Sequence, residues 1–492
     1  MAKTTLEMYS FIISLILLIA GYLFYGAFVE RVFGPDSSRK TPAVAHPDGV
    51  DFIAMPTPKI FMIQFLNIAG TGPIFGAIMG AKFGPAAYLW IVFGCIFAGA
   101  VHDYLMGMLS VRHDGAGMPD IVGNYLGQGT KKVLLVFSIL VLLLVGTVFV
   151  YSPALILGDL AGDGSTKAIM LWVAVIFIYY VCATMLPIDK IIGKIYPVFA
   201  FALIFMAMAL MVCLFIKWPS IPEIWDGISN MGEASGLISG QPIFPCLFIT
   251  IACGAVSGFH ATQSPLMARC ITDENLGGPV FYGAMITEGI VALIWAAISS
   301  YFFYDGGAAA VGSDLSAAAP VVVGKVSMSW LGVLGGVLAL LGVVAAPITS
   351  GDTAFRSARL IIADFLKMDQ KPIRNRILIC IPLFLVVSGM LAYYVADADG
   401  FNVVWRYFGW ANQTLAVFSL WTVTVYLALN KKGLAYLIGM IPAAFMTAVC
   451  LTYILIAKIG FNLPDDWNWS LGISIFFLSI VIFLVWKYRR RA

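Results

Sequence analysis

The stretch NIAGTGP at residues 67–73 interrupts a long apolar run over 59–82 and decides how this chain must fold. Pro73 cannot donate a backbone hydrogen bond, and the two glycines before it loosen the helical ladder. A proline suits the first turn of a new helix. The stretch therefore predicts a membrane helix that stops near Ile68 and restarts near Pro73, at mid-membrane depth.

A second stretch, GAVSGFHATQSP at residues 254–265, has the same features inside the apolar run 244–268. Each break alone is equally well explained as a packing device, because Gly72, Gly76 and Gly80 form a small-residue stripe that lets helices approach closely. The pair is more informative. Two interrupted spans at matching places in two halves, crossing in opposite directions, are typical of inverted-repeat transporters with a site at the midplane.

The composition supports a membrane protein. Of the 492 residues, 61% are hydrophobic and 11% are charged, whereas soluble domains carry about 25% charged residues. Long apolar runs exclude a β-barrel, and a net charge of +3 gives no reason to expect nucleic acid. We predict an all-α integral membrane protein with about 13 transmembrane helices and a five-plus-five inverted-repeat core of the leucine-transporter type. The predicted spans are 8–28, 59–82, 84–110, 132–153, 168–187, 195–216, 244–268, 279–303, 329–351, 377–396, 402–428, 434–457 and 470–486.

Charge fixes the expected orientation. Most of the 29 basic residues fall on one side of these spans, and basic loops stay in the cytoplasm. We expect a multi-pass protein of the cell (inner) membrane, with the N-terminus outside, no cleaved signal and a cytoplasmic C-terminus. The expected units are 1–58 (first helix and cytoplasmic loop), 59–217 (first repeat), 218–428 (second repeat) and 429–492 (two peripheral helices).

The breaks predict a binding site. Unpaired N–H groups at the start of a half-helix favour an anion, and carbonyls that end a half-helix favour a small cation. A carboxylate substrate with a coupling cation meets both needs. His260 is equally consistent with a core histidine, and the amides of span eleven with polar contacts between helices. The predicted substrate-binding residues are Asn67, Gly70, Thr71, Gly72, Ile74, Phe75, Ser257, His260, Gln263, Asn412 and Gln413.

The coupling cation is sodium or a proton. By analogy with the leucine-transporter fold, sodium would lie between the carbonyls of Ile68 and Ala69 and the hydroxyls of Thr349 and Ser350. Those hydroxyls are equally consistent with bonds to preceding carbonyls. If protons are used, Asp103 or Glu288 is the carrier, because ionisable groups inside a membrane are costly and usually functional. Each is as readily a structural carboxyl. We expect no cofactor other than a bound sodium ion.

Six segments resemble the carbon starvation A (CstA) family. They are RKTPAVAHPDGVDF (39–52), NIAGTGPIFG (67–76), FAGAVHDYLMGMLSVRHDG (97–115), FPCLFITIACGAVSGFHATQS (244–264), TSGDTAFRSARL (349–360) and FGWANQTLA (408–416). The resemblance implies the amino acid–polyamine–organocation transporter superfamily, its five-plus-five repeat, and uptake of pyruvate or peptides during nutrient limitation. Better-known members carry a His-His pair where this chain has MIQF (62–65), which favours sodium and weakens the assignment of pyruvate.

The leading hypothesis is an ion-coupled symporter that takes up a small carboxylate nutrient, with pyruvate favoured over short peptides, by alternating access. A membrane nutrient sensor is the alternative, although no signalling domain is attached. An intramembrane hydrolase is disfavoured because Ser257 and His260 lie three residues apart beside one helix start, whereas a nucleophile and its base must be within hydrogen-bond reach and oriented by a third group. The sequence also contains no H-E-x-x-H motif. A channel fits two opposed broken helices less well. We therefore do not expect an enzyme.

Overall fold

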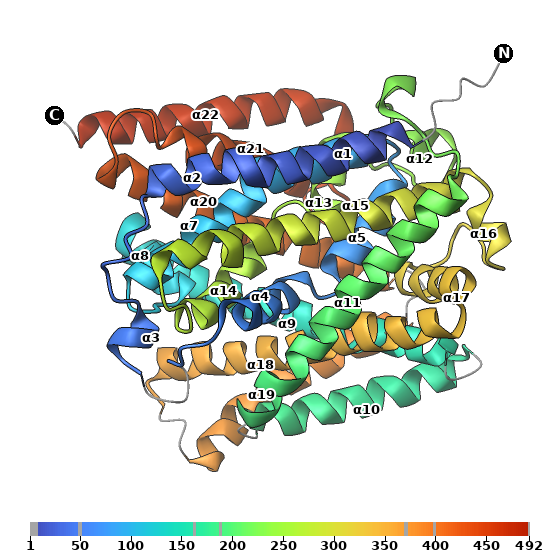
Figure 1. Ribbon diagram of the computed structural model, residues 1–492, viewed down its shortest axis with the longest axis horizontal. Helices are drawn as coiled ribbons and strands as arrows, with labels where there is room; N and C mark the ends of the chain where they lie inside the picture. The colour runs from blue at the N-terminus through green and yellow to red at the C-terminus, as the bar shows by residue number, and fades with distance from the viewer. Residues whose placement is uncertain are drawn as a thin grey trace.

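The computed structural model describes residues 8–47, 52–160, 164–185, 189–368, 372–396 and 400–490, and in this part of the chain all regular structure is helical (Figure 1). The longer helices are α1 (Tyr9–Ala20), α2 (Ala27–Phe33), α4 (Thr57–Ala69), α5 (Gly72–Ala81), α6 (Ala86–Gly94), α7 (Ala100–Arg112), α8 (Met118–Leu126), α9 (Gln128–Leu160), α10 (Thr166–Met185), α11 (Asp189–Lys217), α14 (Gly258–Ala268), α15 (Gly283–Tyr304), α17 (Ala319–Leu338), α18 (Ala345–Leu366), α19 (Ile373–Ala396), α20 (Gly400–Asn430), α21 (Leu437–Ile456) and α22 (Asn468–Arg489).

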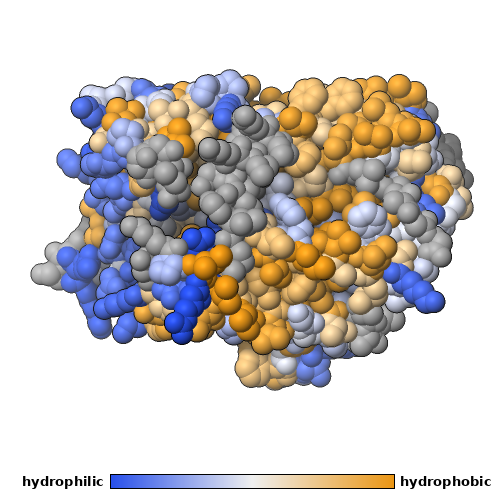
Figure 2. Space-filling view, turned by 90° about the horizontal axis from the view of Figure 1, so that it is seen from below, coloured by the Kyte–Doolittle hydropathy of each residue, from blue (hydrophilic) through white to orange (hydrophobic). Residues whose placement is uncertain are grey.

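Short helices fill the connections: α3 (Pro42–Ala45), α12 (Met231–Ala234), α13 (Phe248–Thr250) and α16 (Gly307–Ala310). Most long helices run roughly along one direction in Figure 1. The C-terminus and the end of α2 lie at the left of that view, which we call the C-terminal end, and the N-terminus lies at the right, the N-terminal end. Figure 2 shows hydrophilic residues gathered at the C-terminal end, beside a broad hydrophobic surface. Such a surface suits lipid.

Within the described residues, eleven helices are long and apolar enough to cross a membrane, or up to twelve if the bent pair α4–α5 counts as one span. Twelve of the predicted spans overlap these segments. The prediction of one more span, 244–268, does not correspond to one long helix, and the total of thirteen stays a prediction.

The first predicted break is confirmed. Helix α4 ends at Ala69, α5 begins at Gly72, and the two are bent by 46°. Gly70 lies between them with φ +44°, a backbone conformation that other residues rarely adopt. Pro73 occupies the first turn of α5, as its fixed φ and missing N–H predict.

The second break is wider than the sequence suggests. Helix α13 ends at Thr250, and α14 begins only at Gly258, so residues 251–257 form no α-helix. Helix α14 then packs against α4, α7 and α20. Protein therefore covers the non-helical backbone, as the cost of unpaired peptide groups in lipid requires.

The predicted limits of span 329–351 are wrong. The backbone leaves the helical region at Gly332, with φ +60°, and the helix that follows continues through a π-helical turn (Ala339–Val344) into α18, which ends at Leu366. The prediction stopped at the charged residues Asp352 and Arg356. These side chains instead form an ion pair of 3.5 Å one turn apart, so an amphipathic helix extends beyond the apolar run.

Candidate functional site

Three helices bring ionisable side chains together in the interior. Asp103 comes from α7, His260 from α14 and Glu288 from α15, and all three are fully buried. His260 Nδ1 lies 2.8 Å from Asp103 Oδ2, and His260 Nε2 lies 3.4 Å from Glu288 Oε2. The imidazole therefore lies between two carboxylates. We call Asp103, His260 and Glu288, with their neighbour His102, the buried acid–histidine cluster.

His102 extends this cluster on the other side of Asp103. Its Nδ1 lies 2.7 Å from Asp103 Oδ1, so each oxygen of that carboxylate faces one imidazole. Neither Glu288 oxygen has a hydrogen-bond partner among the described residues. A buried charge without enough partners is costly. This chain of groups is therefore suited to accepting and passing a proton.

Cys253 borders the same cluster. Donor atoms of Cys253, His260 and Glu288 all lie within 4.8 Å of one another, a spacing that a metal ion could bridge. Thiolate, imidazole and carboxylate are ordinary ligands of zinc and related ions. His260 is also oriented by Asp103, as a metal-bound histidine commonly is by a carboxylate.

Asn412 braces the second break from α20. Its Oδ1 accepts a hydrogen bond of 2.7 Å from the backbone N–H of Phe259, in the first turn of α14. Its Nδ2 donates to the hydroxyl of Ser257 over 3.0 Å. Gln413 Nε2 donates to the carbonyl of Phe248, on the other side of the break. These adjacent amides thus hold both flanks of residues 251–257.

The two breaks touch. Gly72 opens α5, and a Cβ atom built there would lie 2.4 Å from Cys253 Sγ and 2.6 Å from Cys253 Cβ. Thr71, next to Gly72 in the chain, and Gln64, farther back in α4, are buried, and their side chains have no hydrogen-bond partner among the described residues. A small polar ligand between the half-helices would satisfy them.

The other predicted substrate residues are also buried. Asn67 lies at the end of α4, and Ile74 and Phe75 lie in α5. Phe75 packs against the Trp405 ring with centroids 5.9 Å apart. Gln263 donates to the Thr262 hydroxyl. These residues gather around the two breaks, but their role in binding stays a prediction.

The two helices that carry the predicted sodium ligands pack against each other, but no distance between the ligand atoms themselves supports the site. Helix α18 packs against α4, which ends at the predicted ligands Ile68 and Ala69. Thr349 Oγ1 donates to the Ala346 carbonyl over 2.7 Å, as the structural alternative predicts. The Ser350 hydroxyl is buried without a partner among the described residues.

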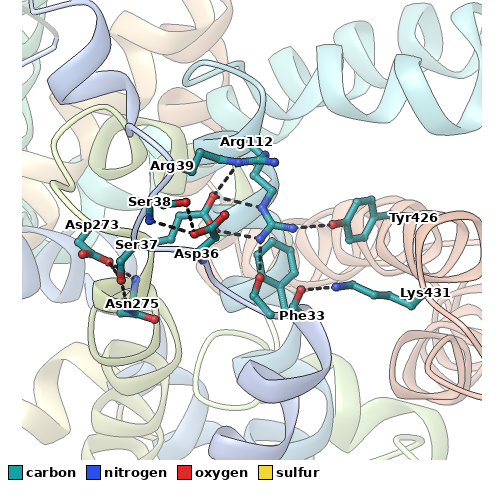
Figure 3. Close-up of polar contacts among 12 residues, drawn as sticks. Phe33, Asp36, Ser37, Ser38, Arg39, Arg112, Asp273, Asn275, Tyr426 and Lys431 are labelled. Atoms are coloured by element: carbon teal, nitrogen blue, oxygen red, sulfur yellow. Dashed lines mark hydrogen bonds and ion pairs between the residues drawn. The ribbon is translucent and has the colours of Figure 1, made fainter.

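An ionic network lies at the C-terminal end (Figure 3). Glu274 is fully buried and accepts hydrogen bonds from Arg112 at 3.2 and 2.9 Å and from the backbone N–H of Asp36 at 2.9 Å. Arg112 also donates to the Tyr426 hydroxyl and lies 4.0 Å from the Phe33 ring centroid. Hydrogen bonds from Ser38 lower the pKa of Asp36. The network joins α2, α7 and α20 with the segment after α14.

A polar cavity of about 370 Å³ opens at the N-terminal end. Among the described residues, its wall includes Lys82, at the end of α5, and Arg406, on α20, and no acidic side chain. Thr250, which ends α13, also lines it. Two basic side chains in one wall favour an anionic solute.

The sequence prediction missed two groups of residues. Cys253 and His102 were not assigned to the site, although both stand beside predicted site residues in the quoted motifs. The Arg112–Glu274 pair joins positions 162 apart. Only the fold reveals such a pair, because no local spacing relates the two residues.

The family described as "Carbon starvation protein CstA" matches residues 7–170, 163–329 and 326–453. An "Uncharacterized membrane protein" of Haemophilus influenzae is 45% identical over 61% of this chain and 92% of its own length. The "Peptide transporter CstA" of Escherichia coli is 24% identical over 96% of this chain and 88% of its own length.

Two further comparisons concern transporters. The "Pyruvate/proton symporter BtsT" of Escherichia coli is 26% identical over 56% of this chain and 46% of its own length. A crystal structure of a manganese transporter from Eremococcus coleocola covers 91% of this chain and 99% of that one, with a TM-score of 0.58 and 13% identity. At that identity the likeness concerns the fold alone.

Proposed function

The chain belongs to the carbon starvation protein CstA family, and from that premise we propose that it is a proton-coupled membrane transporter for a small solute that carries a carboxylate. Pyruvate and short peptides are the two substrates proposed. Relatives named as a peptide transporter and as a pyruvate/proton symporter support this choice. The single observation that carries the proposal is the buried acid–histidine cluster beside a broken helix.

The position of His260 at the start of α14 would couple protonation of the cluster to movement of that helix. His260 lies in the first turn of α14, where Asn412 holds the backbone N–H of Phe259. A proton that enters between Asp103 and Glu288 changes the charge on His260, and hence the forces on the start of α14. The substrate carboxylate would bind at the neighbouring start of α5, where N–H groups lack helical partners.

Alternating access would use the two ends of the bundle in turn. The Arg112–Glu274 network closes the C-terminal end, and the cavity with Lys82 and Arg406 opens at the N-terminal end. The contact between Gly72 and Cys253 joins the two breaks. We propose that the halves containing them form the five-plus-five repeat and rock about this contact.

Sodium is the alternative coupling ion. It would use the carbonyls of Ile68 and Ala69 with the hydroxyls of Thr349 and Ser350. The hydrogen bond from Thr349 to the Ala346 carbonyl uses only the hydroxyl hydrogen. A sodium ion would bind through the oxygen lone pairs, so this bond does not weigh against sodium.

A hydrolase remains the weaker assignment. Ser257 donates to Asn412, while the ring nitrogens of His260 face Asp103 and Glu288. A serine nucleophile needs a base within hydrogen-bond reach, and His260 faces carboxylates instead.

Uptake by the purified protein in liposomes tests the proposal. Labelled pyruvate and a labelled dipeptide would be offered with a pH gradient or a sodium gradient, each imposed alone. We expect accumulation of one substrate with the pH gradient only. A gradient of one pH unit provides about 1.4 kcal/mol per proton, which corresponds to roughly tenfold accumulation when one proton accompanies each substrate molecule. Accumulation that follows only the sodium gradient would overturn proton coupling.

A bound metal ion is the second candidate for the cluster, favoured by the spacing of Cys253, His260 and Glu288. Elemental analysis of the purified protein separates the two readings. Stoichiometric zinc, iron or manganese that disappears in Cys253→Ala would identify a metal site. Uptake that persists after chelation would support the proton relay.

A further inference from the structure

A second cavity, of about 750 Å³, lies at the C-terminal end between the segment after α20 and the last turn of α22. Figure 1 shows the end of α22 at this end of the bundle. Of the described residues that line the cavity, four are cations and none is acidic. We call Lys431, Lys432, Lys487 and Arg490 the basic pocket.

Neutral groups contact three of these four cations. The Lys487 ammonium lies 3.2 Å from the ring centroid of Tyr436, and the Arg490 guanidinium lies 5.4 Å from that of Trp486. Lys431 donates to the Phe33 carbonyl. Among the described residues, no carboxylate lies within 4.0 Å of any of the four charges. Most of their N–H donors therefore stay available to a ligand.

The grouping of like charges needs a counter-charge. Partial burial lowers the pKa of Lys431, the charge of Arg112 lowers it further, and the charge of Glu274 offsets part of this shift. Basic residues at a helix end are ordinarily explained by the helix dipole and by membrane topology. Those explanations do not account for one cavity that is lined by four cations from two separate segments.

The residues around the pocket are of the kinds that contact a membrane lipid. The side of α22 that leads to it exposes large apolar side chains, with Ile482 61% and Val485 44% exposed. Leu429, in the wall of the cavity, is 47% exposed. Trp486 lies beside the charges, as interfacial tryptophans commonly do. A ligand with phosphate groups in the basic pocket and acyl chains along α22 would neutralise the cations and cover the exposed apolar side chains.

We propose that the basic pocket binds the phosphate head group of an anionic phospholipid, with the acyl chains lying along the exposed face of α22. Lys431 also contacts Phe33, which packs against Arg112 (Figure 3). The bound lipid would thus contact the network that closes this end of the bundle. The proposal does not depend on which solute is transported.

The test uses delipidated full-length protein in neutral detergent. Binding of diphosphatidylglycerol and of phosphatidylcholine would be measured by native mass spectrometry and by thermal unfolding. The variant Lys432→Gln/Lys487→Gln/Arg490→Gln removes three pocket charges. Its matched control, Arg31→Gln/Lys132→Gln/Arg374→Gln, removes three charges from exposed basic residues outside the pocket. A single Arg490→Gln variant provides a milder change at an exposed position.

We expect tight binding of the anionic lipid and weak binding of phosphatidylcholine. The pocket variant should lose about a hundredfold in affinity, Arg490→Gln several-fold, and the control variant less than threefold. Equal losses of affinity in the pocket and control variants would mean that binding depends only on the overall surface charge, which would overturn the proposal. Full competition by inorganic phosphate or glycerol phosphate at equal concentration would assign the pocket to a soluble phosphate and overturn the lipid assignment.

Discussion

His260 Nδ1 lies 2.8 Å from one oxygen of Asp103, although the two residues are 157 positions apart in the chain. The contact joins the first turn of α14, beside the second break, to the middle of the bundle. A change in the charge of Asp103 or His260 would therefore alter the electrostatic forces on the non-helical residues 251–257.

Neutralising Asp103 should uncouple transport. In Asp103→Asn we expect accumulation driven by a pH gradient to fall at least tenfold, because the amide cannot exchange a proton with His260. Exchange of labelled for unlabelled substrate, which needs no net proton movement, should continue. Proteoliposome uptake and exchange assays measure the two. The matched control is Asp120→Asn, an exposed aspartate paired with Lys131. Equal loss in uptake and exchange would contradict a coupling role.

The contact between the two breaks can be tested by a rescue. Gly72→Ala should destabilise the protein by about 1–3 kcal/mol, because its new methyl group would overlap Cys253. Cys253→Gly removes the overlapping atoms and should restore most of that stability in the double variant. Thermal unfolding in detergent measures the effect. Gly389→Ala serves as the control, since a methyl group there would meet nothing within 4 Å. Additive effects of the two substitutions would mean that the breaks do not touch.

Asn412 should be required for the second break. Asn412→Ala leaves the N–H of Phe259 without its partner, and a buried unsatisfied donor costs about 1–3 kcal/mol. We expect a lower midpoint of thermal unfolding and loss of uptake. Asn430→Ala removes an amide whose bond goes to a carbonyl of its own helix at an exposed position, and should change stability by less than about 0.5 kcal/mol. Similar losses in both variants would count against the bracing role.

The Arg112–Glu274 pair should hold the C-terminal end closed. Glu274→Gln removes the charge that pairs with Arg112, so we expect this end to open more often. In a variant that keeps Cys270 as its sole cysteine, 4% exposed, maleimide labelling should become about tenfold faster. Glu233→Gln, at an exposed position, is the control. An unchanged labelling rate in Glu274→Gln would show that the pair does not act as a gate.

Several features could be predicted from the sequence because their cause is local. Pro73 and the glycines before it lack the donor or the stiffness that a continuous helix needs, so the break between Ala69 and Gly72 was predictable. Membrane character followed from apolar runs alone. Family-specific segments gave the same assignment as the comparison with the whole family.

Other features required the tertiary structure because they join distant segments. Hydropathy ended the predicted span at 351, but α18 continues to Leu366, and Asp352 and Arg356 pair with each other one turn apart on it. The same limit applies to function. Asp103, His260 and Glu288 could be recognised one by one as charges in apolar helices, each with a structural alternative. Only the packing of α7, α14 and α15 placed the imidazole between the two carboxylates, because distances between side chains on different helices depend on how the helices pack.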